Sequence, residues 1–164
     1  MKAAEASGLS AELHIYVDAD ACPVKEEIYR VSARTRIGVT IVANSWFRVP
    51  QSPLITREVV SDGFDAADDW IAQRARAGTI VVTSDILLAD RCVKAGAAVL
   101  APNGKAFTAD TIGSAVATRA IKEDLRAGAN LTNAAIGGPA PFSKADRSAF
   151  LQALDREITR LTKC

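Results

Sequence analysis

The sequence predicts an α/β protein built on a parallel sheet of about four to five strands, which helices flank and a helical C-terminal tail follows. Short runs that are apolar on both faces recur at 13–17, 38–43, 79–83 and 97–101. Segments of helical composition separate most of these runs, as in parallel sheets that are covered on both sides. Of the 164 residues, 49% are hydrophobic and 24% are charged, a composition typical of one globular domain.

Local signals place the elements of the first half of the chain. Residues 1–12 predict a flexible leader, and the single domain is expected to span 13–164. The run Leu13–Val17 predicts a strand, and Asp20 and Pro23 predict the cap and the first turn of the helix that follows. A second strand is expected at Gly38–Ala43. A loop with two prolines then precedes a short strand at Arg57–Val60.

The second half continues the alternation up to Pro102. Helical composition spans Asp65–Ala77, and Thr79–Thr83 is the cleanest strand pattern in the chain. Ile86–Ala95 predicts a helix, which Gly96 ends. A last strand is expected at 97–101, and nothing after it resembles a strand.

The tail after Pro102 predicts two helices. Thr108 or Asp110 can cap the first, which is expected to reach about residue 127. A loop follows, and Ser143 with Asp146 three residues later predicts the start of an amphipathic helix that reaches about residue 161. The predicted tail is therefore wholly helical.

Aspartates gather where the predicted strands end. Asp18 and Asp20 follow the first strand, and Asp85 follows the strand 79–83. Because the carboxyl ends of parallel strands meet at one edge of a sheet, these three side chains should share that edge. A single Asp at a helix start is ordinarily a cap. Three acids after two strands exceed what capping requires, so they are the candidate catalytic residues.

A predicted helix adds more carboxylates. Asp65, Asp68 and Asp69 are spaced i, i+3 and i+4, so one helix face can present them together if the helix begins at the same edge. Crowded carboxylates repel one another unless a cation compensates, and oxygen ligands select Mg²⁺ or Mn²⁺. The candidate metal ligands are therefore Asp18, Asp65, Asp68, Asp69 and Asp85.

Other residues near the strand ends are candidates for contacting a nucleic acid. Trp46 and Arg48 lie in the loop with two prolines, where an indole can stack on a base and a guanidinium can hold a phosphate. The aromatic residues of this loop could equally serve only as its anchors. The candidate substrate-binding residues are Asn44, Trp46, Arg48, Thr83, Ser84 and Arg119.

Charge and cysteine content exclude several classes of protein. Lys and Arg number 20 and Asp and Glu 19, so the net charge of +1 excludes a strongly basic nucleic-acid coat. The three cysteines form no CxxC pair, which argues against a disulfide framework or a structural zinc site and favours the cytoplasm. No segment approaches the roughly 20 apolar residues of a membrane-spanning helix, so no membrane partner is expected.

Four motifs together resemble the bacterial YaiI/YqxD family. They are DADACPVK at 18–25, GFDAADDWI at 63–71, IVVTSDILLAD at 80–90 and GGPAPFSKADRSAF at 137–150. That family is grouped with the PIN-like and NYN nuclease superfamily. The resemblance implies that Asp18 and Asp85 are its strand-end acids, and that Asp65 with Asp68 or Asp69 is its helix acid. The chain departs at Leu87, where the NYN-type motif carries a second Asp.

Three functions remain open from the sequence. The first is a nuclease that uses Mg²⁺ or Mn²⁺ to cleave RNA, or DNA, with Asp20 orienting or deprotonating water. The second is a haloacid-dehalogenase-like phosphatase, in which the DxD at 18–20 would supply the nucleophile and the general acid. The third is a non-catalytic α/β binding module that keeps the acidic edge without cleaving anything.

Overall fold

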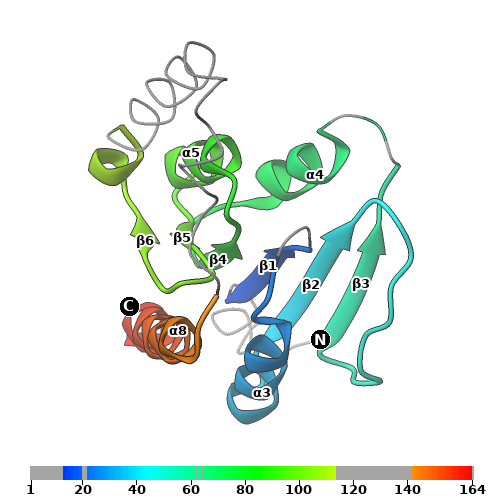
Figure 1. Cartoon of the computed structure of the whole chain (residues 1–164). Coiled ribbons are helices and arrows are strands. Elements are labelled where there is room, and N and C mark those ends of the chain that lie inside the picture. Colours follow the sequence, from blue (N-terminus) through cyan, green and yellow to red (C-terminus); the bar gives the residue numbers. More distant parts are fainter. Residues whose placement is uncertain (1–12, 20–21, 62, 64, 114–141, 164) are drawn as a thin grey trace, which may run out of the picture.

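A computed structural model describes residues 13–19, 22–61, 63, 65–113 and 142–163. Six strands form one sheet in the order β3-β2-β1-β4-β5-β6 (Figure 1). The first five are parallel, and β6 pairs antiparallel with β5. The predicted α/β class and parallel sheet are confirmed. The strands are β1 (His14–Asp18), β2 (Gly38–Ala43), β3 (Ile55–Val59), β4 (Thr79–Val82), β5 (Ala98–Leu100) and β6 (Ala106–Phe107).

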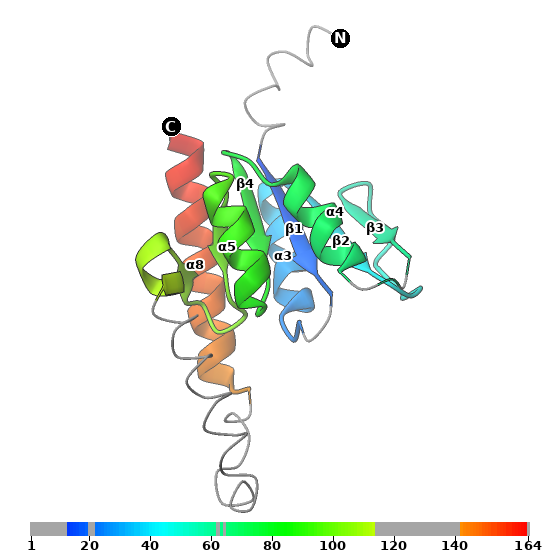
Figure 2. The same ribbon diagram turned by 90° about the horizontal axis from the view of Figure 1, so that it is seen from above.

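Helices cover the two faces of the sheet in pairs (Figures 1 and 2). On one face lie α3 (Lys25–Thr35) and α8 (Lys144–Lys163), and on the other lie α4 (Ala66–Arg74) and α5 (Ile86–Lys94). Among the described residues, none of the helices combines the length and the apolarity that crossing a bilayer requires.

Alternating side chains of the strands divide the core into two layers. Ile15 and Val17 of β1 pack on the α3/α8 side together with Phe150 of α8. Val81 of β4 packs on the other side against Leu88 of α5. Because helices bury both faces, the central strands are apolar without a polar alternation, as the sequence predicts.

Strand β6 is the element that the sequence interpretation missed, because two residues are too few to show a period. Its turn does carry a signal, since Asn-Gly is a preferred hairpin dipeptide and Asn103-Gly104 precedes β6. Gly104 has a φ of 91°. A Cβ atom built on Gly104 would lie 2.7 Å from the backbone of Ala149, so α8 also requires a glycine here.

Two helices differ from their predicted bounds. Val24 is the N-cap of α3 and makes no side-chain cap, so Pro23 lies before the helix and not in its first turn. Helix α4 ends at Arg74, three residues earlier than predicted, because the chain turns extended at Ala75. The cap predicted from Asp20 lies outside the described residues.

The tail agrees with its predicted caps where it is described. The Ser143 N–H donates to Asp146 Oδ2 at 3.0 Å, and the Asp146 N–H donates to Ser143 Oγ at 3.1 Å, which confirms the capping box of α8. Residues 109–113 are helical, and Thr108 Oγ1 accepts from the Thr111 N–H. The remainder of that predicted helix, Arg119 and the leader 1–12 lie outside the described residues.

Candidate active site at the carboxyl edge of the sheet

The strand order has a topological switch point between β1 and β4. From β1 the chain proceeds outward through β2 and β3, then crosses to β4 on the other side of β1. Ligands of open α/β sheets bind at such a switch point, outside the carboxyl ends of the strands. Asp18 is the last residue of β1 and Thr83 directly follows β4. Both side chains alternate with residues of the α3/α8 core and therefore face the α4/α5 side.

Thr83 connects the two strand-end aspartates. Its Oγ1 donates to Asp18 Oδ2 at 3.0 Å and accepts from the backbone N–H of Asp85 at 3.0 Å. The side chain of Asp18 is buried and Thr83 is only 2% exposed. Thr83 therefore positions Asp18 and Asp85 and has little surface with which to contact a ligand directly.

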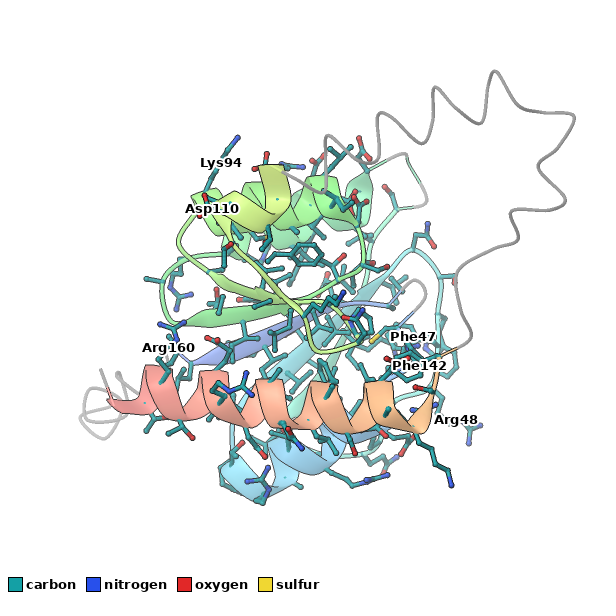
Figure 3. All side chains as sticks on the ribbon, turned by 60° about the vertical axis from the view of Figure 1, so that its left-hand side comes forward. Phe47, Arg48, Lys94, Asp110, Phe142 and Arg160 are labelled. Carbon is teal, nitrogen blue, oxygen red and sulfur yellow. The ribbon has the colours of Figure 1, made fainter. Side chains whose placement is uncertain are left out.

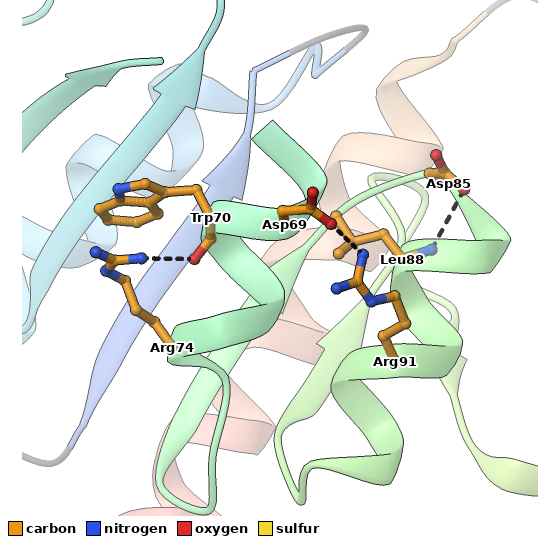
Figure 4. Close-up of polar contacts among 6 residues, drawn as sticks. All are labelled: Asp69, Trp70, Arg74, Asp85, Leu88 and Arg91. Atoms are coloured by element: carbon orange, nitrogen blue, oxygen red, sulfur yellow. Dashed lines mark hydrogen bonds and ion pairs between the residues drawn. The ribbon is translucent and has the colours of Figure 1, made fainter. Parts of the chain in front are cut away.

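Asp85 is the N-cap of α5. Its Oδ1 accepts from the N–H of Leu87 at 2.9 Å and from the N–H of Leu88 at 3.4 Å, and Figure 4 draws the second of these bonds. The capping interpretation therefore holds for this oxygen. Oδ2 accepts no hydrogen bond from any residue that the structure describes, so the cap occupies only half of the carboxylate.

Asp68, in the first turn of α4, belongs to the same acidic group. Burial and the neighbouring carboxylates of Asp85, Asp18 and Asp65 raise its pKa to about 6, although Arg91 opposes the shift. The start of α4 reaches this edge because β3 is parallel to β1, so the chain leaves β3 at the carboxyl edge. Around Asp68, the described carboxylates that raise its pKa therefore outnumber the one arginine that lowers it.

Asp65 and Asp69 lie differently from what one helix face predicts. Asp65 precedes α4 in a left-handed conformation with φ of 66°, so helical spacing does not apply to it. Asp69 Oδ1 accepts from Arg91 Nη1 at 2.9 Å across the α4/α5 pair, and both side chains are about half exposed (Figure 4). Asp69 is thus engaged by a cation, while Asp68 faces the other carboxylates.

The predicted metal site stays a prediction. In the part of the chain that the structure describes, no group of three or more His, Cys, Asp or Glu residues is arranged to hold a metal ion unaided. Asp20, which the sequence adds to the group, lies outside the described residues.

The remaining candidates lie around the acidic group and not within it. Asn44 and Ser84 are exposed after the ends of β2 and β4, and Trp46 and Arg48 are exposed in the loop beyond β2. The sequence interpretation missed Arg57 and Arg91. No local pattern points to them, because their contacts depend on packing between segments that are distant in the sequence.

Comparison with known proteins agrees with the sequence motifs. The model of the uncharacterised YaiI/YqxD family matches residues 16–160. The chain belongs to this family. It is 66% identical over 149 residues to a UPF0178 protein of Sphingopyxis alaskensis, with 91% of this chain and 95% of that protein covered. No solved structure matches the chain significantly.

Other YaiI/YqxD relatives are similar over nearly their whole length. The UPF0178 protein bll3966 of Bradyrhizobium diazoefficiens is 57% identical over 91% of this chain and 87% of its own length. UPF0178 protein RPA2191 of Rhodopseudomonas palustris is 56% identical over 91% of this chain and 92% of its own. The predicted family resemblance is thereby confirmed.

Proposed function

We propose that this YaiI/YqxD protein is a divalent-metal-dependent hydrolase that cleaves phosphodiester bonds of a nucleic acid at the carboxyl edge of its sheet. The observation that carries the proposal is the hydrogen-bonded link from Asp18 through Thr83 to Asp85 at the carboxyl edge of the sheet. Asp68, in the first turn of α4, belongs to the same edge, and the raised pKa of its carboxyl agrees with this placement. The grouping of this family with PIN-like and NYN nucleases supports the same activity.

The acidic group suits a hard divalent cation. Its donors are carboxylate oxygens, which favour Mg²⁺ or Mn²⁺ over softer metals. The pKa of Asp68 is raised partly by its acidic neighbours, so a bound cation would relieve that repulsion. Asp18, Asp68 and Asp85 would each contribute oxygens to the ion, and water and the phosphate would complete its coordination, because the described carboxylates alone are not arranged as a metal site. Such an ion supplies a nucleophilic water at neutral pH and neutralises charge on the phosphate.

Residues around the acidic group prepare it for this role. The Thr83 hydroxyl fixes one oxygen of Asp18, and the cap at the start of α5 fixes one oxygen of Asp85. Carboxylates held in this way lose less conformational freedom when they bind a ligand. Arg91 withdraws Asp69 into an ion pair and reduces the negative charge that an incoming phosphate meets.

Cleavage of labelled single-stranded RNA and DNA in Mn²⁺ tests the proposal. We expect cleavage by the wild-type chain and a loss of at least about 100-fold in Asp85→Asn, which removes a charge while asparagine keeps the helix cap. Asp90→Asn is the matched control. It removes one charge from the same helix at a residue paired with Lys94, and it should keep full activity.

Two results would contradict the proposal. The first is that the cleavage test fails: either the wild-type chain cleaves neither polymer, or Asp85→Asn keeps as much activity as the control Asp90→Asn. The second is a phosphoryl adduct trapped on Asp18 with hydrolysis of small monoesters. That adduct would establish the aspartyl-phosphate mechanism of the phosphatase alternative.

A further inference from the structure

The large hydrophobic side chains that the described part of the chain exposes all lie at the carboxyl edge. They are Trp46 (66% exposed), Leu87 (56%) and Val59 (42%). Trp46 follows β2, Val59 ends β3 and Leu87 lies in the first turn of α5, so all three lie along the carboxyl edge of the sheet. Exposed apolar surface that gathers at one edge is typical of a binding site, whereas scattered single residues need no explanation.

Trp46 is held in place by a cation on one side of its ring. The guanidinium carbon of Arg57, on β3, lies 4.5 Å from the centroid of the indole. Arg57 Nη1 also donates to the backbone oxygen of Phe47 at 3.1 Å. Arg57 therefore contacts both the indole ring and the backbone of the loop that carries it. Trp46 is 66% exposed and Arg57 is its ring partner among the described residues, so much of the indole remains accessible.

The loop that carries Trp46 is anchored at its next residue. Phe47 packs against the α3/α8 core, and Lys25 Nζ lies 5.5 Å from the centroid of its ring. Phe142, just before α8, packs against the same core, and Figure 3 labels both rings together with the exposed Arg48. The chain thus partly buries Phe47 and leaves Trp46 and Arg48 at the surface.

The position of Trp46 relates it to the acidic group. Asp18 pairs with Val42 in the β1/β2 ladder, and Trp46 is four residues beyond Val42. Four residues span at most about 14 Å even when fully extended. Arg57 pairs with Ile41 of the α3/α8 core, so its side chain leaves the sheet on that side, opposite the acidic group. A flexible polymer that binds at the acidic group and crosses the carboxyl edge can reach the indole within a few of its units.

We propose that Trp46, braced by Arg57, is a stacking platform for an unpaired base of a single-stranded nucleic acid. An aromatic face with cations beside it is what single-strand binding proteins offer, since every base has a π-face and each link carries a phosphate. A duplex hides its base faces in the stack, so it cannot use the indole in this way. The inference rests on the proposed function, because it names the substrate class of the same site.

Binding measured without divalent metal tests the platform separately from cleavage. In a Trp70→Phe background Trp46 is the remaining tryptophan, so its emission reports on this site alone. The probes are a short single-stranded oligodeoxythymidine, an abasic oligomer of equal length and charge, and a duplex, all in EDTA. We expect the base-bearing single strand to quench Trp46, and the abasic oligomer and the duplex to leave its emission nearly unchanged.

Substitutions identify the stacking contribution. The substitutions are made in the Trp70→Phe background, and fluorescence anisotropy of the labelled oligomers measures how tightly each variant binds them. Trp46→Ala should weaken binding of the base-bearing strand by about 5- to 150-fold, the range of a single base stack, and should leave binding of the abasic oligomer unchanged. Trp46→Phe should lose only a few-fold. Thr56→Ala, at an exposed residue of the same strand as Arg57 but outside this apolar surface, should bind within about twofold of wild type.

The outcomes separate the platform from the hydrolase. Equal binding by wild type and Trp46→Ala, an equal loss on base-bearing and abasic oligomers, or no binding of any oligomer would overturn the platform. If no oligomer binds, the exposed apolar residues Trp46, Val59 and Leu87 would instead indicate a protein partner. Binding that depends on Trp46 in a chain that cleaves nothing would uphold the platform and overturn the hydrolase.

Discussion

Acidic side chains on the two sides of the carboxyl edge are neutralised to different degrees. On the α3/α8 side the buried carboxylate of Glu27 lies 3.3 Å from Arg147 Nη1, and the same nitrogen donates to the carbonyl of Pro23 at 2.7 Å. On the α4/α5 side three carboxylates raise the pKa of Asp68, and Arg91 alone among the cations lowers it. Glu27 is matched by one arginine, whereas around Asp68 the described carboxylates outnumber the one arginine.

This difference separates structural acids from candidate functional ones. Buried or crowded charges cost free energy unless they are paired, so a structural carboxylate normally has a cation beside it. Glu27 has one, and the result is a link between α3 and the start of α8. Asp68 differs, because three described carboxylates and one arginine act on its pKa.

Removing the arginine from the paired side should have the largest effect. Arg147→Ala leaves Glu27 buried without its partner and also removes the guanidinium that lies 5.0 Å from the ring centroid of Phe142. We expect the free energy of unfolding to fall by about 3 kcal/mol, since breaking a buried pair costs more than the pair contributes. Urea denaturation followed by circular dichroism measures it.

Arg34→Ala provides the matched control for that measurement. Arg34 also links α3 to α8, through an ion pair with Asp155 at 2.6 Å, but the side chains of Arg34 and Asp155 are both about half exposed. An exposed pair is worth at most about 1 kcal/mol, so this variant should remain near wild type. Equal losses in the two arginine variants would show that burial of Glu27 does not distinguish the pairs.

Adding a divalent cation should raise the free energy of unfolding by slightly less than Arg147→Ala lowers it. An ion that binds only the folded chain adds about 2.7 kcal/mol at a hundredfold excess over its dissociation constant. We therefore expect Mn²⁺ and Mg²⁺ to raise the Tm at matched ionic strength, and the Asp18→Asn, Asp85→Asn double variant to lose the response. A wild-type Tm that is indifferent to millimolar Mn²⁺ would contradict the metal site.

Neutralising Asp68 should produce the smallest effect, with a sign opposite to that of Arg147→Ala. Its folded pKa of about 6 lies above the ordinary value of 3.8, so the folded state holds the proton more tightly. Stability from this group is therefore lost as pH rises from about 4 through 6. In EDTA at pH 7.5, Asp68→Asn should raise the Tm by a few degrees at most, because solvent screens this partly exposed side chain.

The pH dependence provides the check on that prediction. Below pH 4 the carboxyl is protonated in both states, so the advantage of Asp68→Asn over wild type should disappear. Asp69→Asn serves as the control, because it loses an ion pair with Arg91 and should gain no stability at pH 7.5. An Asp68→Asn variant that melts below wild type at pH 7.5 would show that this carboxylate is not repelled by its neighbours.

Much of the fold could be predicted because its signals are local. The run at 79–83 is apolar on both faces because both are covered, and the Ser143-Asp146 box marks the start of α8 within four residues of sequence. The edge shared by Asp18 and Asp85 followed from parallel strands alone. The two-residue strand β6 could not be predicted from periodicity, although Asn103-Gly104 carried the signal of its turn.

The roles of individual acids were less accessible to prediction. Asp65, Asp68 and Asp69 have the same residue type and nearly the same position, yet Asp69 pairs with Arg91 and Asp68 faces Asp85. The difference comes from the packing of α4 on α5, since Arg91 is 22 residues from Asp69 in the sequence. Trp46 and Arg57 meet for a related reason, because the loop between β2 and β3 folds back beside β3.

The sequence by itself determined the layered α/β architecture, the edge at which the aspartates gather and the family to which the chain belongs. Hydrophobic periodicity, strand direction and caps are properties of short segments, so one chain suffices to infer them. Only the tertiary structure decided which carboxylates are paired, which remain close together and which aromatic ring is braced at the surface. Coulomb energy and burial depend on distances between segments far apart in the chain, and folding sets those distances.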